Sequence, residues 1–314
     1  MKKNYFSLAA TLLCSLLFVA CGNQKPKSNW MADDDVRVAI DETFQPIMDN
    51  LVQTFGMANV EANMKPVYVS EDSALRMLVN DSIRCCIATR KLSDREKTVI
   101  KGHNLGLKQA TDAIALIVNK ENTDSLISLE EIKGIVSGKI TRWEQLKHHT
   151  RSGELKLLFD NSGSSTVRFM KDSLCGGKDI QGNVYASEGK TNESVIEMVK
   201  ADPTIIGVIG TNWLKGNSET ALADFSKLDI NVMRVSRNPD TYAKYVRPYQ
   251  YYIATGDYSL LRSVYIITTD PRTQSLVRNF FFFAKGQKGQ TIICNNSQLL
   301  PITPVQVKKV DVNE

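Results

Sequence analysis

Hydrophobic and polar positions follow two different periods at the start of the chain. Residues 36–40, VRVAI, alternate with a period of two, which is typical of a strand. Apolar side chains then recur at the i, i+3, i+4, i+7 and i+8 spacing of an amphipathic helix, at Phe44, Ile47, Met48, Leu51, Val52 and Phe55. The pattern therefore predicts a strand followed directly by a helix.

The same alternation continues to the end of the chain. Further strands are predicted at residues 66–69, 83–89, 111–119, 155–159, 205–210, 230–235 and 264–267. Helices are predicted at residues 73–79, 128–137, 166–174, 194–201 and 274–285. Strands that alternate with helices indicate an α/β fold in which helices cover both faces of a parallel sheet.

Two helix starts carry a capping-box signature. Ser93 precedes Glu96 by three residues, and Ser128 precedes Glu131 by the same spacing. In such a box the hydroxyl accepts from the backbone of the third helical residue, and the glutamate accepts from the backbone of the cap. Both positions are therefore expected to begin helices.

The first 21 residues are typical of a leader that directs export. Lys2 and Lys3 precede an apolar stretch that ends at Ala20 and Cys21, after which the chain becomes polar. The stretch is shorter than the about 20 apolar residues of a membrane span, and Ser7 and other hydroxyls interrupt it. Its end resembles a bacterial lipobox, which implies a lipid on Cys21 and anchoring on the periplasmic side of a membrane.

Composition bounds the remaining chain. Residues 22–35 are polar and predict a flexible tether. A length of 314 residues is typical of about two domains. The net charge is +5, of which Lys2 and Lys3 belong to the leader, and the basic residues are dispersed. We therefore expect no nucleic-acid partner.

Cysteine and histidine spacing offers little support for a metal site, a cofactor or a reaction. Four cysteines follow Cys21, and none forms a CxxC pair: Cys85, Cys86, Cys175 and Cys294. They are interpreted as mostly buried thiols, and a disulfide between distant ones stays open. The three histidines, His103, His148 and His149, lie in no nucleophile or metal motif. We expect no metal, no cofactor and no enzyme.

Small polar residues stand at two predicted helix starts. One is Thr43, before the first helix, and the other is the run from Ser162 to Thr166. Unpaired backbone N–H groups and a partial positive charge make a helix start suited to an anion, and glycine lets the backbone approach closely. Ordinary N-capping by serine and threonine explains the same residues.

Several segments, in order along the chain, resemble one family. Residues 132–143, IKGIVSGKITRW, are similar to the helix-and-turn signature of the phosphate-binding components of bacterial phosphate ABC transporters. Ser162-Gly163-Ser164 stands where the family has Ser-Gly-Thr. Other similar segments are residues 112–119, 203–210, 258–267 and 289–301. The resemblance runs from about residue 36 to the end.

The resemblance implies a two-domain α/β periplasmic-binding-protein fold of type II, with a hinge and an anion buried between the domains. The division it implies is leader 1–21, tether 22–35, domain one at 36–115 and 250–314, and domain two at 116–249. Closure around the ligand would occur by hinge motion.

The resemblance also implies site residues. Thr43 and Phe44 match the Thr-Phe of the first helix start, where Phe44 would donate its backbone N–H. Ser70 or Ser73 matches a serine of the second helix, and Thr89 matches a serine before a short loop. The phosphate turn is matched at Ser162, Gly163 and Ser164, or at Ser165 and Thr166 under a shift of one or two residues.

The chain departs from the family at two charged positions. Leu158 stands where the family has an arginine, and Arg90 stands where its phosphate binders have an aspartate. Because both members of that charged pair are gone, the site is interpreted as rewritten. Arg90 and Arg168 are the candidate replacement cations.

The resemblance implies capture of phosphate or a similar oxyanion for an ABC-type membrane permease. The alternative is a scaffold lipoprotein of another cell-envelope complex that kept the fold and lost phosphate binding. A receptor needs a cation or several convergent N–H groups in the cleft, whereas a scaffold does not.

Overall fold

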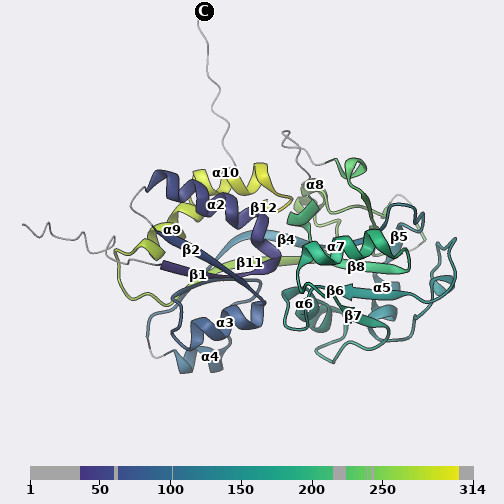
Figure 1. Ribbon diagram of the computed structural model, residues 1–314, viewed down its shortest axis with the longest axis horizontal. Coiled ribbons are helices and arrows are strands. Elements are labelled where there is room, and N and C mark those ends of the chain that lie inside the picture. The colour runs from purple at the N-terminus through teal and green to yellow at the C-terminus, as the bar shows by residue number, and fades with distance from the viewer. Residues whose placement is uncertain are drawn as a thin grey trace, which may run out of the picture.

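The computed structural model describes residues 36–59, 63–100, 102–214, 224–238, 240–241 and 244–303. The predicted leader, Cys21 and the tether 22–35 lie outside these residues. The chain forms two α/β domains that lie side by side and are joined by long strands (Figure 1).

Domain one begins with the strand and helix that the first apolar pattern predicted. Its amino-terminal elements are β1 (Val36–Asp41), η1 (Glu42–Phe44), α2 (Gln45–Ala58), β2 (Met64–Val69), α3 (Glu71–Val79), β3 (Cys85–Ala88) and α4 (Asp94–Val99). The end of the chain completes it with α9 (Leu276–Lys285), α10 (Gln287–Asn296) and β12 (Leu300–Pro301). Helices α2, α9 and α10 cover one face of the sheet, and α3 and α4 the other (Figure 1).

Domain two lies between these two parts in the sequence. Its strands are β5 (Leu126–Ser128), β6 (Lys156–Phe159), β7 (Val184–Ala186), β8 (Ile205–Gly210), β9 (Ile230–Val232) and β10 (Arg234–Ser236). Its helices are α5 (Leu129–Val136), α6 (Ser165–Leu174), α7 (Asn192–Ala201) and α8 (Gln250–Thr255), with the short η2 (Trp143–Gln145), η3 (Thr211–Leu214) and η4 (Phe225–Lys227). Both predicted capping boxes are present, at the starts of α4 and α5.

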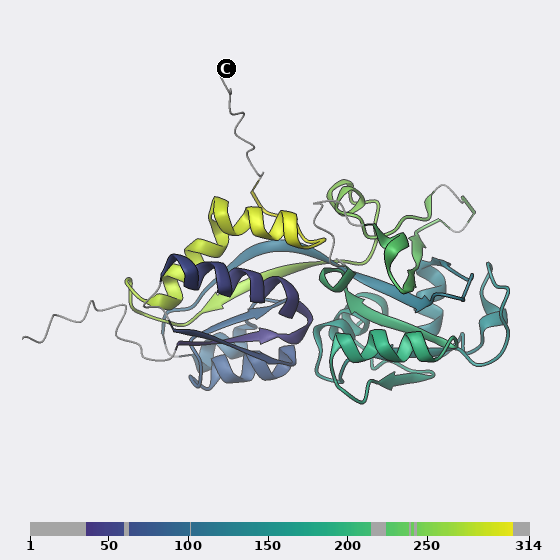
Figure 2. The same cartoon turned by 45° about the horizontal axis from the view of Figure 1, so that its top comes forward.

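Two strands, β4 (Leu105–Asn119) and β11 (Leu261–Thr268), connect the domains. They pair antiparallel with each other, and the far half of β4 continues into domain two beside β8 (Figure 2). The strand order is β2-β1-β3-β11-β4-β8-β6-β7. The prediction of a parallel sheet holds for β1 with β2 and β3 and for β6 with β7 and β8, but it is wrong at β4 and β11, which run antiparallel to their neighbours.

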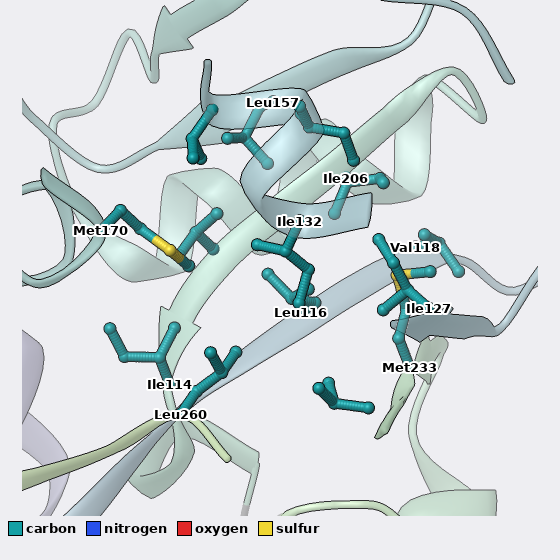
Figure 3. Packing of buried hydrophobic residues seen from close by; sticks show 14 of the residues in the cluster. Ile114, Leu116, Val118, Ile127, Ile132, Leu157, Met170, Ile206, Met233 and Leu260 are labelled. Atoms are coloured by element: carbon teal, nitrogen blue, oxygen red, sulfur yellow. The ribbon is translucent and has the colours of Figure 1, made fainter. Parts of the chain in front are cut away.

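Each domain has its own apolar core. The largest cluster lies in domain two, where Leu116 of β4 and Ile132 of α5 pack with Ile206 of β8 (Figure 3). A second cluster, around Phe44 and Phe280, fills domain one. Five buried residues that the predicted division assigned to domain one pack in the domain-two cluster: Ala113, Ile114, Ile253, Tyr258 and Leu260.

Candidate anion-binding site

The starts of α3 and α6 meet where the two domains touch. Ser70 caps α3 of domain one, and Ser164 caps α6 of domain two. A Cβ on Gly163, in the turn before α6, would lie 3.2 Å from Ser70 Oγ, so the two turns face each other closely. The N–H of Asp72 donates to the carbonyl of Gly163 across this contact, at 3.2 Å. Glycine at position 163 thus permits the close approach of the two domains.

Thr43 and Phe44, two of the candidate site residues, lie at the same interface. Thr43 Oγ1 is 3.5 Å from Ser165 Oγ of domain two, and both hydroxyls are buried. The Thr43 carbonyl accepts from the side chains of Asn212 and Trp213, which also belong to domain two. The ring of Phe44 is fully buried and lies under the guanidinium of Arg262, 5.3 Å from its centroid.

The hydroxyls of the serine turn, residues 162–166, have different partners. Ser164 Oγ accepts from the N–H of Val167 and shares a 2.8 Å hydrogen bond with Thr166 Oγ1. Thr166 donates to Asp160 at 2.9 Å, and all three side chains are buried. Ser162, in contrast, is exposed. Ser164 therefore acts as an ordinary helix cap, which is the alternative that the sequence left open. Its position at the interface also agrees with the resemblance.

Thr89 and Arg168 meet at a carboxylate. Glu71, the first residue of α3, is completely buried and accepts from the Thr89 N–H at 2.6 Å and from its hydroxyl at 2.7 Å. Arg168 of α6 donates to the same carboxylate through Nε at 2.5 Å and to Thr89 Oγ1 through Nη2 at 2.6 Å. Burial raises the pKa of Glu71, but Arg168 and Thr89 outweigh it and hold that pKa below its ordinary value. Glu71 is therefore ionised at neutral pH.

A second buried ion pair lies on the strands that connect the domains. Arg262 of β11 donates through Nε to Asp112 of β4 at 2.8 Å and through Nη1 to Ser165 at 2.7 Å. Asp112 also accepts from Thr211. Arg262 Nη2 is buried without a hydrogen-bond partner among the described residues, and a Cβ on Gly210 would lie 3.3 Å from it. The pair places a cation beside Ser165.

Three further buried carboxyl groups surround the interface. Burial, reinforced by the charge of Glu71, raises the pKa of Asp41 to about 7. Burial also raises the pKa of Glu42 to about 7, although Asn192 at the start of α7 donates to it through its backbone and its amide. The pKa of Asp160 is raised by burial as well. An oxyanion that enters this interface therefore meets both arginines and several acids.

Arg90 and Ser73 have their side-chain partners within domain one. Arg90 forms a two-pronged ion pair with Glu96 of α4, at 2.7 and 2.8 Å, within domain one. Of the two candidate serines, Ser70 is the one opposite Gly163, while Ser73 accepts from Arg76. The structure thus brings Thr43, Ser70, Thr89 and the serine turn together and engages Arg90 elsewhere.

A cavity of about 460 Å³ opens beside the serine turn. Its polar wall includes Asn161, Ser162 and Arg168, and its apolar wall includes Val167 and Ile180. Arg168 thus connects this cavity with the buried carboxylate of Glu71.

Other kinds of site find no support in the part of the chain that the structure describes. No cluster of three or more His, Cys, Asp or Glu residues there could hold a metal ion, and no helix there is long and apolar enough to cross a bilayer. Within those residues no disulfide joins the cysteines at 85, 86, 175 and 294.

Sequence reasoning missed Glu71 and the Asp112–Arg262 pair. A signal existed for the pair, because Asp112 and Arg262 are opposite charges next to the apolar runs 113–118 and 264–267, a pattern that favours buried partners. Glu71 carried no such signal, since acidic residues are common in the first turn of any helix.

Two domains on a shared pair of strands, with donors from both converging where they touch, define a solute-binding protein of the two-domain type. Residues 27–285 match the PBP superfamily domain, and the chain belongs to this superfamily.

Relatives and solved structures agree with this assignment. The chain is 22% identical to the phosphate-binding protein PstS of Staphylococcus saprophyticus, covering 93% of this chain and 88% of the relative. It is 26% identical to the protein of the same name from Borreliella burgdorferi, covering 90% and 93%. An ABC-type phosphate transport receptor from Vibrio cholerae has a similar fold, with a TM-score of 0.63, 16% identity and coverage of 85% of this chain and 100% of that one. The expected two-domain binding-protein fold is confirmed.

Proposed function

We propose that this protein is an extracytoplasmic substrate-binding protein that captures phosphate or a related oxyanion between its domains and delivers it to the membrane permease of an ABC transporter. The names of its relatives support this ligand class. So do the predicted donors Thr43, Ser70 and Thr89, which lie at the interface rather than scattered over the surface.

One observation carries the proposal. The donors that sequence reasoning selected for an anion, Thr89 and Arg168, converge on an ionised oxygen anion, the carboxylate of Glu71. Charge-assisted hydrogen bonds of this kind suit phosphate and similar oxyanions equally well, because guanidinium and backbone N–H groups recognise the same oxygen geometry. The proposal assigns binding to this site and no reaction.

Anchoring is the second part of the proposal. The leader ends at Cys21 in a lipobox-like sequence, and a lipid there would hold the protein on the periplasmic side of a membrane. Mass spectrometry of the amino-terminal peptide from membranes is expected to show acyl chains on Cys21. Release of the unmodified protein into the soluble fraction, with Cys21 intact, would contradict this part alone.

Calorimetry tests whether the protein binds phosphate or a similar oxyanion. The mature chain, with Cys21→Ser, is titrated with phosphate, arsenate and sulfate, and we expect a phosphate Kd of about 1 μM or tighter, near −8 kcal/mol. Ser164→Ala is expected to weaken binding. Ser128→Ala removes an equivalent helix cap in α5, away from the interface, and is expected not to change affinity. Silence toward every oxyanion from a folded protein would refute the proposal and favour the scaffold alternative.

A further inference from the structure

Glu71 is placed as a bound anion would be placed. Its carboxylate has no exposed surface and accepts from one backbone N–H, one hydroxyl and one guanidinium. These donors come from both domains, because Thr89 follows β3 of domain one and Arg168 lies in the first turn of α6 in domain two. A carboxylate of the chain thus makes the contacts of an interdomain ligand.

Arg168 has few donors to spare while Glu71 is present. Its Nε donates to Glu71, its Nη2 to Thr89, and its Nη1 to Asp172 on the next turn of α6. The charge of the guanidinium is therefore already matched inside the protein. An incoming dianion would gain little from Arg168 and would face the negative charge of Glu71 at short range, which costs free energy in a water-poor interface.

From this geometry we propose that Glu71 is an internal competitor for the oxyanion site, and that its displacement from Arg168 and Thr89 determines the affinity of the protein for its ligand. This inference rests on the proposed function and names the residue that limits it. Glu71 also links α3 to α6, so the same contact favours domain closure without ligand. The free energy of oxyanion binding to the wild-type protein is then the difference between the interaction free energies of two anions, the oxyanion and Glu71, with one set of donors.

The test compares Glu71→Gln with the wild type by phosphate calorimetry. Glutamine keeps the shape and an acceptor for Thr89 but removes the charge, so Arg168 loses its buried counter-ion and keeps only the ion pair with the exposed Asp172. We expect phosphate affinity to rise about tenfold or more, a change of about 1.4 kcal/mol or greater. The matched control is Glu131→Gln, a buried glutamate in the first turn of α5 that lies away from the interface. Its phosphate affinity is expected to equal that of the wild type.

A double variant separates competition from a general structural effect. Arg168→Met added to Glu71→Gln removes the freed cation, and the gain in affinity is expected to disappear. Should Glu71→Gln fail to fold, Glu71→Asp withdraws the carboxylate by one methylene, and a smaller gain is expected.

The outcomes distinguish this inference from the proposed function. Binding by the wild type with unchanged or weaker binding by folded Glu71→Gln, or by Glu71→Asp in its place, overturns the inference alone. Binding by Glu71→Gln with none by the wild type supports the competitor. Silence in all folded variants overturns both the inference and the proposed function.

Discussion

The pH dependence of stability should report directly on Glu42. This side chain is 5% exposed and lies at the domain interface, where its carboxylate accepts from the backbone and amide of Asn192. Burial raises its pKa from 4.5 to about 7, because the hydrogen bonds from Asn192 do not offset the lost hydration.

The magnitude follows from that pKa. A rise from 4.5 to about 7 corresponds to about 3 kcal/mol at 1.36 kcal/mol for each tenfold step. Between these pH values the folded protein binds a proton that the unfolded chain releases, so the free energy of unfolding falls as the pH rises. The contribution is present in full below pH 4.5 and is lost above pH 7. Asp41, whose pKa is also raised to about 7, acts in the same direction.

Urea denaturation at intervals from pH 4.5 to pH 8 measures this effect in the wild type and in Glu42→Gln. The variant keeps an oxygen for Asn192 but cannot ionise, so we expect its free energy of unfolding to fall less steeply as the pH rises. The difference between wild type and variant should therefore change by up to about 3 kcal/mol between pH 4.5, where the two are most alike, and pH 8. Glu96→Gln is the control, because Arg90 and Ser93 hold the pKa of Glu96 at about 2, below the tested range. Parallel curves for the wild type and Glu42→Gln would refute this account of Glu42.

Three other predictions concern buried groups. Arg262→Met leaves Asp112 without its ion-pair partner, and denaturation should show a loss of about 3–5 kcal/mol; adding Asp112→Leu should recover part of it, and no recovery would contradict the pairing argument. Gly210→Ala places a Cβ 2.4 Å from Thr43 Cγ2 and should cost about 1–3 kcal/mol, whereas Gly56→Ala, in open space within α2, should stabilise by about 0.5–1 kcal/mol. Burial raises the pKa of Cys85 and Cys86 far above the ordinary thiol value. Peptide mapping after alkylation should therefore find both cysteines unmodified in the native protein and modified in urea. Rapid labelling of either cysteine in the native protein would show that the strand opens.

Local patterns were sufficient for elements whose signal lies within a few residues. The stripe that starts at Phe44 predicted α2, and Ser93 and Ser128 marked the starts of α4 and α5. Prediction was weaker where a strand is formed by pairing with a distant part of the chain. Strand β4 begins at Leu105, six residues before the predicted start, because β11 pairs with a stretch that contains Gly106 and the exposed Lys108 and so carries no buried-strand pattern.

The site shows the same limit. Thr43, Ser70 and the serine turn were predicted from a resemblance that depends on short motifs, and their meeting at the interface follows from the fold. Glu71 acquires its role from Arg168, which lies 97 residues away, so no local pattern could reveal it. Arg90 was proposed as a cation for the cleft. In the structure it donates to Glu96, six residues further along the chain in the first turn of α4.

The position of β11 has a consequence for the order in which the protein folds during synthesis. This strand lies between β3 and β4 in the sheet, yet it is formed by residues near the carboxyl end of the chain. Until residues 261–268 leave the ribosome, β3 and β4 have unpaired edges, which are sites of aggregation. Most of domain two, in contrast, is already complete at that stage. A nascent chain stalled before residue 261 should therefore carry a folded second domain beside an unfinished first one and should depend on a holding chaperone.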